Sequence, residues 1–513
     1  MTSMRRAGFG AAGPLDSVTV ESASGAGREL VRVNPARHDE VVGTLVTTEV
    51  PVVGAVVDAA DVAQHHWAAM PLDERVAHLR AAARAVAARA EELAPLLARE
   101  SGKPIVDSAG ELGFAAAFLD WVCDRVGEVA ADREVDDVAG RVLLTREPFG
   151  VVAAIVPWNA PLILSSLKVA PALATGNAIV VKPSPVAPFA VTEALATIAA
   201  HLPPGVLSVV HGDGDVGAAL IGHRAVRKVA FTGGETVGRT VLHGCADSLT
   251  PAVLELGGND AAVVLDDLTF SDEVMERLVF GAFLTAGQVC MAAKRLLVPE
   301  HRLDELTDAF VAAAERVLVC GDPLDPDVTI GPVATPAQVE RVERLVDDAR
   351  AQGATVIELG TTTAAFDPTR GWFVRPTLVR DVATSAALVE EEQFGPTLPV
   401  LAYRDLDEAI RMANGTDFGL ASSVWSDDED RAFRVGRRLD AGMTFVNCHN
   451  RAGMSFRVPF GGVKRSGFGR EFGDEGIAEY LQTHALHRPA AARLGARPST
   501  GRNARPGTAY PTG

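Results

Sequence analysis

The sequence predicts an α/β protein with more than one domain, and three observations support this. The chain has 513 residues, whereas single hydrophobic cores stop growing at about 250–300 residues. Short β-branched runs alternate with longer helical stretches, which is the pattern of βαβ units. The alternation occurs once in residues 150–257 and again in residues 258–448, so we expect two α/β domains.

Composition argues against several classes of protein. The formal net charge is -18, whereas nucleic-acid binding requires a basic surface. Charged residues interrupt every long apolar run, so no stretch is suited to crossing a membrane, and the start of the chain lacks the apolar centre of a secretory signal. The five cysteines have no metal-type spacing and favour a reducing cytoplasm. We expect a cytoplasmic protein without a metal; the scarcity of lysine beside arginine is a weak indication of bacterial origin.

The two ends of the chain differ from its middle. We expect residues 1–29 to be a flexible N-terminal segment and residues 489–513, rich in arginine, proline and glycine, to be a disordered tail. Residues 30–130 are mainly helical and belong with the first sheet. Within them, "LDERVAHLRAAARAVAARAEEL" has charged and apolar faces, and Gly102 and Pro104 predict where this helical stretch ends.

Five runs predict the strands of the first sheet: residues 150–159, 177–184, 205–212, 227–234 and 251–258. Their spacing indicates a Rossmann-like parallel sheet covered by helices on both faces. Each run ends with polar residues or glycine, namely Asn159, Lys182, Gly212, Gly233 and Glu255. Ligands of open parallel sheets bind beyond the carboxyl ends of the strands, so this edge is the candidate site.

Two glycine-rich stretches at this edge are candidates for phosphate binding. "GDGDVG" at 212–217 formally matches the dinucleotide fingerprint, but Asp213 and Asp215 would present negative charge to a pyrophosphate. "FTGGETVG" at 231–238 opens a helix, and exposed N–H groups at a helix start can hold phosphate. An ordinary strand-to-helix turn is the alternative for both.

Two further segments have strand-like patterns and belong to neither sheet. They are residues 140–150 and 479–488, within the wider segments 131–149 and 472–488. We expect them to pair into a small β ribbon that joins subunits in a homodimer or homotetramer, since exposed strand edges invite pairing. A plain surface hairpin is the alternative.

Eight motifs, in this order and spacing, resemble the aldehyde dehydrogenase superfamily over residues 31 to about 487. They are VPWNAP (156–161), KPS (182–184), FTGGETVG (231–238), LELGG (254–258), GQVC (287–290), EEQFGP (391–396), VNC (446–448) and PFGGVKRSGFGRE (459–471). The resemblance implies a cofactor domain, a catalytic domain at 258–448, and NAD(P)-dependent oxidation of an aldehyde to its acid. A noncatalytic structural member of the fold and a cofactor-free ester or thioester hydrolase are the alternatives.

The resemblance implies roles for Cys290, Asn159 and Glu255. Cys290 is the implied nucleophile, because a thiolate adduct lets hydride leave and yields a thioester; by itself a cysteine is more often a small buried hydrophobe. A helix terminus, Lys294 and Arg295 could lower the thiol pKa. The Asn159 side chain and the Cys290 N–H are the implied oxyanion donors, although Asn159 alone favours a turn residue that caps the next helix. Glu255 is the implied base for hydrolysis, which separates this chain from the branch that acylates coenzyme A.

The resemblance also assigns the cofactor contacts. Lys182 is expected at the adenosine ribose, Glu392 at the nicotinamide ribose and Phe394 beside the nicotinamide. The other expected contacts are Trp158, Ser184, Gly212, Phe231, Gly233, Gly234, Gly238 and Leu256. Pro185 stands where NAD-preferring members commonly have a glutamate that repels a 2′-phosphate. We therefore expect NAD and keep NADP open.

The segments around Cys290 predict a roomy apolar substrate tunnel. Its expected lining is Ala160, Leu164, Phe283, Leu284, Val289, Met291, His449, Asn450, Arg451 and Phe460, and residues 449–471 form a substrate and anchor loop. Ala160 replaces a larger aromatic residue of relatives, which favours an aromatic or medium-chain aliphatic aldehyde. His449 and Asn450 could orient a substrate hydroxyl. The alternative is a semialdehyde whose carboxylate binds Arg451 or Arg457, although anchoring the loop is the favoured role of Arg457.

Overall fold

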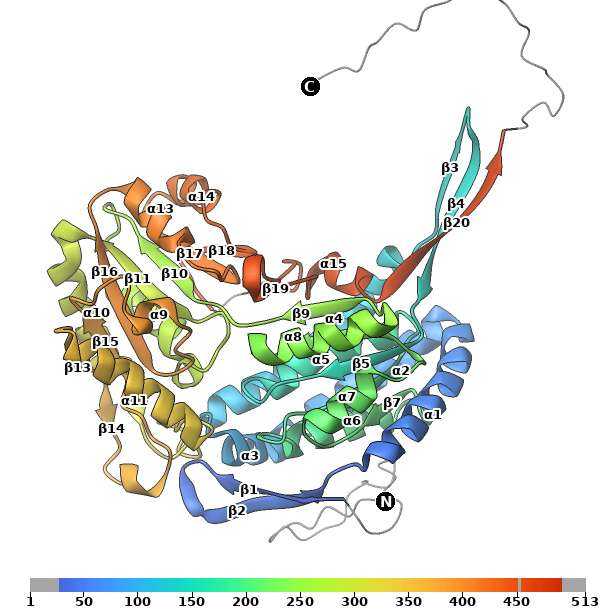
Figure 1. Ribbon diagram of the computed structural model, residues 1–513, viewed down its shortest axis with the longest axis horizontal. Coiled ribbons are helices and arrows are strands. Elements are labelled where there is room, and N and C mark those ends of the chain that lie inside the picture. The colour runs from blue at the N-terminus through green and yellow to red at the C-terminus, as the bar shows by residue number, and fades with distance from the viewer. Residues whose placement is uncertain (1–26, 451–453, 491–513) are drawn as a thin grey trace, which may run out of the picture.

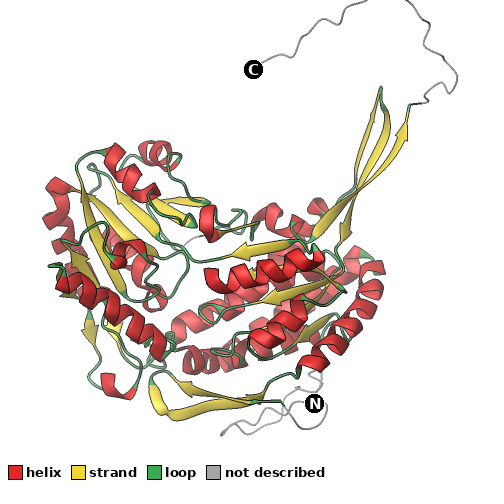
Figure 2. Cartoon of the chain, in the orientation of Figure 1, coloured by secondary structure: helices red, strands yellow, loops and turns green. Residues whose placement is uncertain are grey.

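The computed structural model describes residues 27–450 and 454–490. The expectations for the N-terminal segment before residue 27, for Arg451 and for the tail after residue 490 lie outside the described residues. Figures 1 and 2 show two α/β units, each built on one large sheet, and a thin ribbon of strands that projects from the body.

A hairpin and four helices precede the first large sheet. The antiparallel strands β1 (Glu29–Asn34) and β2 (Arg37–Val46) are followed by α1 (Val50–Ala69), α2 (Leu72–Ala88), α3 (Ala90–Ser101) and α4 (Ile105–Val129). Gly102 follows α3 with φ 82°, a left-handed conformation that suits glycine at the end of a helix. The predicted end of this helical stretch is confirmed, whereas the hairpin was not predicted.

The first large sheet has six strands in the order β19-β9-β8-β5-β6-β7. The five predicted strands are parallel and correspond to β5 (Val151–Ile155), β6 (Ala178–Lys182), β7 (Leu207–Val209), β8 (Val226–Thr232) and β9 (Ala252–Glu255). The unpredicted β19 (Gly467–Phe468) pairs antiparallel with β9. The helices are α5 (Pro161–Ala174), α6 (Phe189–Ala199), α7 (Gly214–Ile221) and α8 (Glu235–Ser248).

Both faces of this sheet are buried. Val152 and Ala154 of β5 pack in one apolar core with α4 and α5, whereas Val151 and Ala153 pack in another with α1 and α7. Successive side chains of a strand point to opposite faces, so a continuous apolar run serves two cores. This explains why the predicted strands are apolar at nearly every position.

The second large sheet has seven strands in the order β13-β15-β16-β11-β10-β17-β18. Six are parallel, namely β10 (Asp260–Val264), β11 (Ala293–Pro299), β15 (Thr377–Arg380), β16 (Thr397–Tyr403), β17 (Ala421–Trp425) and β18 (Met443–Val446), and β13 (Thr355–Glu358) is an antiparallel edge. The helices are α9 (Asp272–Phe283), α10 (Leu303–Val317), α11 (Pro336–Ala351), α12 (Ala387–Glu390), α13 (Leu406–Asn414) and α14 (Glu429–Gly436). A short pair, β12 (Val319–Cys320) and β14 (Thr361–Thr362), lies apart from it.

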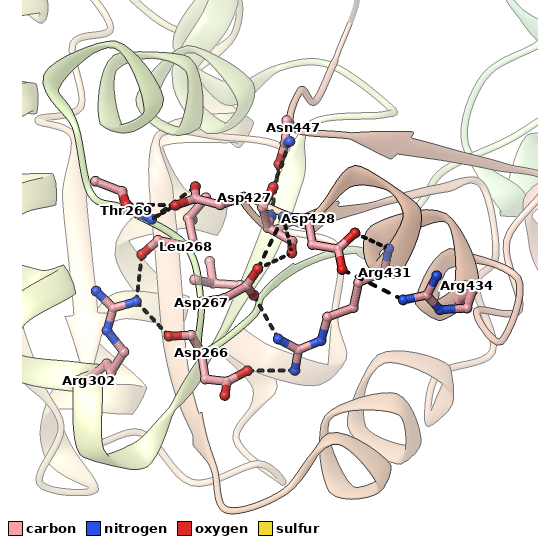
Figure 3. Close-up of polar contacts among 12 residues, drawn as sticks. Asp266, Asp267, Leu268, Thr269, Arg302, Asp427, Asp428, Arg431, Arg434 and Asn447 are labelled. Atoms are coloured by element: carbon pink, nitrogen blue, oxygen red, sulfur yellow. Dashed lines mark hydrogen bonds and ion pairs between the residues drawn. The ribbon is translucent and has the colours of Figure 1, made fainter.

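Polar contacts hold the carboxyl ends of β10, β17 and β18 together (Figure 3). Arg431 of α14 donates to Asp266 at 2.6 Å and to Asp267 at 2.8 Å. The Asn447 side chain accepts from the Ser426 N–H at 2.9 Å and donates to the Ser426 carbonyl at 2.8 Å. These contacts fix the point at which the chain leaves the second sheet toward residues 449–471.

The projecting ribbon consists of β3 (Arg133–Asp137), β4 (Gly140–Pro148) and β20 (Leu481–Pro489), in the order β20-β4-β3 (Figure 1). The expected pairing of the two segments is confirmed, since β4 and β20 are antiparallel neighbours along their whole length. The short helix α15 (Gly473–Ala478) leads into β20. In the described part of the chain, no helix has the length and apolarity that crossing a membrane requires.

Candidate active site

Cys290 lies in a tight turn of the second unit. It follows the 3-10 helix η2 (Leu284–Gly287), which continues from α9, and precedes β11. Thr285 and Ala286 have φ of 55° and 54°, a left-handed conformation that is costly for residues with a side chain. A Cβ atom on Gly287 would lie 2.3 Å from the Gly395 carbonyl oxygen, so only glycine allows this approach. Backbone strain is therefore concentrated directly before the thiol.

The electrostatic surroundings of Cys290 correct the expectation of an acidified thiol. Burial raises the pKa of the Cys290 thiol to about 12, and Lys294 opposes this shift without overcoming it. Arg295 points elsewhere, because its guanidinium binds the backbone carbonyls of Asn259, Met412 and Ala413. The thiol in this arrangement needs a proton acceptor before it can act as a nucleophile.

Asn159 follows β5 and is directed at the segment that carries the thiol. Its side-chain Nδ2 donates to the backbone carbonyl of Gln288 at 3.0 Å. The backbone carbonyl of Asn159 accepts from Lys103 Nζ at 2.6 Å. Helix α5 begins without a side-chain cap, so the alternative role of Asn159 as a helix cap is wrong. Glu111 accepts from the Leu162 N–H at 3.2 Å instead and also pairs with Lys103.

Glu255 is the last residue of β9 and is only 3% exposed. Neither of its carboxylate oxygens accepts a hydrogen bond from any residue that the structure describes. Burial raises the pKa of Glu255 well above its usual range, Glu471 raises it further, and Lys168 opposes both. Burying a carboxyl without hydrogen-bond partners costs free energy of folding. Buried groups with strongly shifted pKa values are often catalytic, so Glu255 is a candidate catalytic residue.

Lys168 and Glu471 form a buried pair beside Glu255 that sequence reasoning missed. Lys168 of α5 donates to Glu471 at 2.5 Å and to the Thr232 hydroxyl at 2.6 Å. A signal was present, because a lysine inside an otherwise apolar helix must find a partner when it is buried. Glu471 closes the motif PFGGVKRSGFGRE, whose strand β19 pairs with β9 beside Glu255.

A cavity of about 850 Å³ opens at the carboxyl edge of the first sheet. Six of the expected cofactor residues line it: Trp158, Lys182, Ser184, Phe231, Gly233 and Gly234. Pro185 and Asp213 also line it. Lys182 Nζ donates to the Gly212 carbonyl at 2.7 Å, and burial lowers the pKa of Lys182 to about 8, with Asp215 opposing the shift. A buried cation with spare donors suits ribose hydroxyls or phosphate.

The expected glycines allow close packing at the start of α8. A Cβ on Gly233 would lie 2.6 Å from the Phe231 ring, and one on Gly238 would lie 2.6 Å from the Leu256 side chain. Gly234 precedes the first residue of α8, and no side chain caps that helix start. Gly233, Gly234 and Val237 line the cavity, so the start of α8 lies at its edge, where an anion would be stabilised.

Glu392 and Phe394 approach the same edge from the second unit. The Phe394 ring stands nearly perpendicular to Trp158, with 5.6 Å between ring centroids. Glu392 accepts from the Gly258 N–H at 3.1 Å and lies 3.4 Å from Lys294 Nζ. The structure thus brings cofactor candidates of both units to the gap between the cavity and Cys290.

Part of the expected substrate lining gathers in one apolar cluster. Leu164 and Phe460 belong to it, and Ala160, Cys290 and Met291 pack against it. Leu284 and Val289, which precede Cys290 in the chain, are buried. Sequence reasoning missed an aromatic group in the same cluster: Phe114, Phe118, Trp121, Phe456 and Phe472, with ring centroids 5.2 Å apart between Phe114 and Phe456. The spacing of the three α4 aromatics is that of one helix face and could have revealed them.

Three expected lining residues require correction. Phe283 packs against Phe310 in the core of the second unit. His449 is enclosed, with its Nδ1 2.7 Å from the Ser423 hydroxyl, and buried Asn450 donates to the Gly281 carbonyl at 3.3 Å. Both polar side chains contact groups of the second unit, although the His449 Nε2 has no hydrogen-bond partner among the described residues. Arg457 is exposed and its charge lowers the pKa of Asp474, after the larger effect of Arg125.

Within residues 27–450 and 454–490, no cluster of three or more His, Cys, Asp or Glu side chains is arranged to hold a metal ion. A parallel sheet with a large cavity at its carboxyl edge, glycines at a helix start and a buried lysine define a nucleotide-binding α/β protein. Cys290, which follows a strained turn, and the buried Glu255 add a reactive site to it.

The model of the "Aldehyde dehydrogenase family" matches residues 21–486, and the chain belongs to this family. Aminoaldehyde dehydrogenase 2 of Zea mays is 37% identical over 468 residues, covering 89% of this chain and 91% of the relative. Geranial dehydrogenase of Castellaniella defragrans is 38% identical over 426 residues, covering 82% and 87%. The NAD-dependent aldehyde dehydrogenase structure from Sinorhizobium meliloti matches with a TM-score of 0.88 and 32% identity, covering 94% and 95%. The chain is therefore an oxidoreductase of the NAD(P)-dependent aldehyde dehydrogenase type.

Proposed function

We propose that the chain oxidises an aldehyde to its carboxylic acid through a thioester on Cys290. The thiolate adds to the carbonyl carbon, and the oxyanion of this adduct accepts hydrogen bonds from the Asn159 side chain and the Cys290 N–H. Bound NAD(P) supplies the acceptor for the hydride that leaves the adduct carbon. Water activated by Glu255 then cleaves the thioester and releases the acid.

One observation carries this proposal: a thiol that follows a strained turn is acted on by the charge of a buried glutamate that has no hydrogen-bond partner among the described residues. The charge of Glu255 contributes to the raised pKa of Cys290. A carboxylate whose own pKa is raised is a stronger base than an exposed one and can take a proton from the thiol or from water. The buried pair of Lys168 and Glu471 holds the opposing charges that tune this base.

We expect NAD as cofactor, with NADP as the alternative. The cavity of about 850 Å³ and the buried Lys182 fit a dinucleotide, and solved relatives include NAD-dependent and NADP-dependent enzymes. In our proposal Lys182 and Ser184 bind the adenosine ribose, the start of α8 binds phosphate, and Glu392 and Phe394 orient the nicotinamide. Pro185 offers no charge to repel a 2′-phosphate, but Asp213 on the same wall does.

We propose an aromatic or medium-chain aliphatic aldehyde as the substrate. The aromatic group of Phe114, Phe118, Trp121, Phe456 and Phe472 supports an apolar substrate, as does the similarity to a geranial dehydrogenase. Aromatic faces also attract cations, so the relative named for aminoaldehydes provides the competing class. Arg457 is exposed, and the relatives named for glutarate semialdehyde support a semialdehyde as the alternative substrate. Turnover of a panel containing geranial, benzaldehyde, an aminoaldehyde and glutarate semialdehyde ranks these classes.

We propose that residues 30–130 and 150–257 bind the cofactor, that residues 258–448 carry the thiol, and that residues 449–471 close the substrate site. The ribbon of residues 131–149 and 472–488 is the proposed contact between subunits of a dimer or tetramer. The scattered positions of the five cysteines, without metal-type spacing, support the proposed cytoplasmic location.

Replacement of the thiol tests the reaction. We expect Cys290→Ala to lower aldehyde turnover by at least about a thousandfold, because the covalent route is lost, while the affinity for NAD stays within about twofold. Reduced nicotinamide absorbance measures turnover and calorimetric titration measures affinity. Cys448→Ala, at the other partly exposed cysteine, is the matched control. Turnover of Cys290→Ala near the wild-type rate would contradict the role of Cys290, and a wild type inactive on the whole panel would favour a noncatalytic member of the fold.

A further inference from the structure

Lys294, in β11, is buried directly beneath the turn that carries Cys290. Its side chain is 3% exposed, and its ammonium donates to the carbonyls of Val289 and Cys290. A third contact reaches Glu392, whose carboxylate oxygen lies 3.4 Å away. One buried cation therefore binds two peptide units of the thiol turn and a residue that we assign to the cofactor.

The contact with Val289 acts on the backbone N–H of Cys290. The Val289 carbonyl and the Cys290 N–H belong to one planar peptide unit and point in opposite directions. The carbonyl accepts from Lys294 Nζ at 3.0 Å and from the Ala292 N–H at 3.1 Å. Two donors on one side fix the plane of the peptide, and a charged donor polarises it, which strengthens the N–H on the other side. That N–H is one of the two oxyanion donors in the proposed reaction.

The contact with Glu392 places the same cation between the thiol turn and a residue that we assign to the cofactor. Glu392 also accepts from the Gly258 N–H at 3.1 Å. A Cβ on Gly257 would lie 2.2 Å from the Glu392 carboxylate, and one on Gly258 would lie 3.0 Å from the Cys290 carbonyl. The two glycines therefore let the carboxylate and the thiol turn pack against one backbone segment, with Lys294 joining them.

We propose that Lys294 is a positioning residue that orients and polarises the Cys290 N–H for the oxyanion and couples the thiol turn to Glu392. This inference rests on the proposed function, because it assigns the Cys290 N–H to the oxyanion. Lys294 touches neither substrate nor reacting atoms in this scheme and acts through the peptide between residues 289 and 290.

The charged groups that face Cys290 determine how removal of Lys294 changes the pKa of the thiol. Glu392, Glu255 and Asp260 all raise the pKa of the thiol, and Lys294 is the cation that lowers it. Asp260 is itself buried beside this group, and its carboxyl lies 3.9 Å from His449 Nε2. Without Lys294, three acids face the thiol, and no cation remains among the groups that shift its pKa; Arg295, also in β11, acts on Asp260 instead. Ionisation of Cys290 then requires a higher pH.

Ester hydrolysis in the absence of nicotinamide isolates the thiol and its oxyanion donors from hydride transfer. We expect Lys294→Met to lower kcat/KM for p-nitrophenyl acetate by about tenfold or more, since loss of a whole oxyanion donor costs about a hundredfold to a thousandfold. The pH midpoint for alkylation of Cys290 by iodoacetamide is expected to rise by about one unit. Lys294→Arg keeps the charge and the donors, so it is expected to restore the midpoint and most of the rate.

Lys228→Met is the matched control, because Lys228 is also buried and ion-paired, with Glu479 at 2.8 Å, but lies in the amino-terminal half of β8. We expect its esterase rate and alkylation midpoint to stay within about twofold and 0.2 pH units of wild type. If Lys294→Met does not fold, as judged by circular dichroism, Lys294→Gln decides the same comparison.

The outcomes separate this inference from the proposed function. A wild type without esterase or aldehyde turnover, and without alkylation at Cys290, contradicts the proposed function. An active wild type with an unchanged rate and midpoint in Lys294→Met overturns the role of Lys294 alone. Equal losses in Lys294→Met and Lys228→Met, or no recovery in Lys294→Arg, also overturn it, because they indicate a general structural effect.

Discussion

Burial gives the individual residues of this site their chemistry. Glu255 is a common carboxyl at the end of a strand, yet burial, with no hydrogen-bond partner among the described residues, raises its pKa well above the usual range. The same enclosure raises the pKa of Cys290 to about 12. A protonated thiol and a nearby carboxyl that binds protons more strongly than usual are matched for proton transfer between them.

We expect Glu255→Gln to give one slow burst of reduced cofactor and then to stall, because the thiol must ionise without this base and water is no longer activated. Stopped-flow absorbance measures the burst, and the steady-state rate is expected to fall by about a hundredfold or more. The acylated enzyme should show added mass on the peptide that contains Cys290. A steady-state rate equal to wild type would remove Glu255 from hydrolysis.

The raised pKa of Glu255 also predicts how the wild type responds to pH. The rate of deacylation is expected to rise as pH increases through this pKa, since only the ionised carboxylate can accept a proton from water. The folded state favours the protonated form, so this contribution to stability is complete below the unfolded pKa of about 4.3 and is lost as pH rises through the folded pKa. Melting temperatures from pH 5 to 9 should therefore decline less in Glu255→Gln than in wild type. Equal declines would contradict this sign.

At the scale of elements, the loop between β7 and α7 decides what the adenosine end of the cavity can accept. Lys182 binds the Gly212 carbonyl, and the next residue, Asp213, lines the cavity and pairs with Arg28. The "GDGDVG" stretch therefore does lie at the cavity edge, but it contributes an acid there as well as bare backbone. Pro185 removes one repulsive charge from this wall, and Asp213 provides another.

We expect Asp213→Asn to improve NADP binding relative to NAD by about tenfold, an energy of about 1.4 kcal/mol. The change removes a negative charge near the 2′-phosphate and frees Arg28 to bind it. Calorimetric titration with each nucleotide gives the ratio directly. Asp308→Asn, at an exposed acid on α10, is the control and should leave the ratio unchanged. An unaltered ratio in Asp213→Asn would show that this acid does not select the cofactor.

The parallel strands could be predicted from sequence because each is an apolar run between turn residues, followed by a helical stretch. The strand β19 could not, because two residues carry no periodic pattern and form a strand only by pairing with β9. The hairpin of β1 and β2 was missed for a related reason, since burial of its positions is irregular along each strand.

At the scale of the whole molecule, the ribbon is a surface without a partner in the described part of the chain. All five residues of β3 are exposed, and the large apolar side chains Val135 and Leu486 are 37% and 47% exposed. Leu486 stands opposite Leu143 in the register of β20 and β4. Exposed apolar side chains on a projecting sheet favour contact with another subunit.

We expect the wild type to form a dimer or tetramer and Leu486→Asp to shift it toward smaller species, because a charge is then buried at the contact. Light scattering after size-exclusion chromatography measures the mass. Phe433→Asp, at a large apolar residue that is 61% exposed on α14, is the matched control. A monomeric wild type would contradict the proposed role of the ribbon.

The sequence by itself determined the alternation of parallel strands and helices, the edge at which polar residues collect, and the motifs that contain Cys290, Glu255 and Asn159. These properties follow from local periodicity and from residue type, which the chain carries without folding. Only the tertiary structure decided that burial raises the pKa of the Cys290 thiol and that His449 and Asn450 are buried against the second unit. It also decided that Lys168 and Lys294 lie beneath the site. Burial and Coulomb interactions depend on which distant segments meet, and no local pattern encodes those distances.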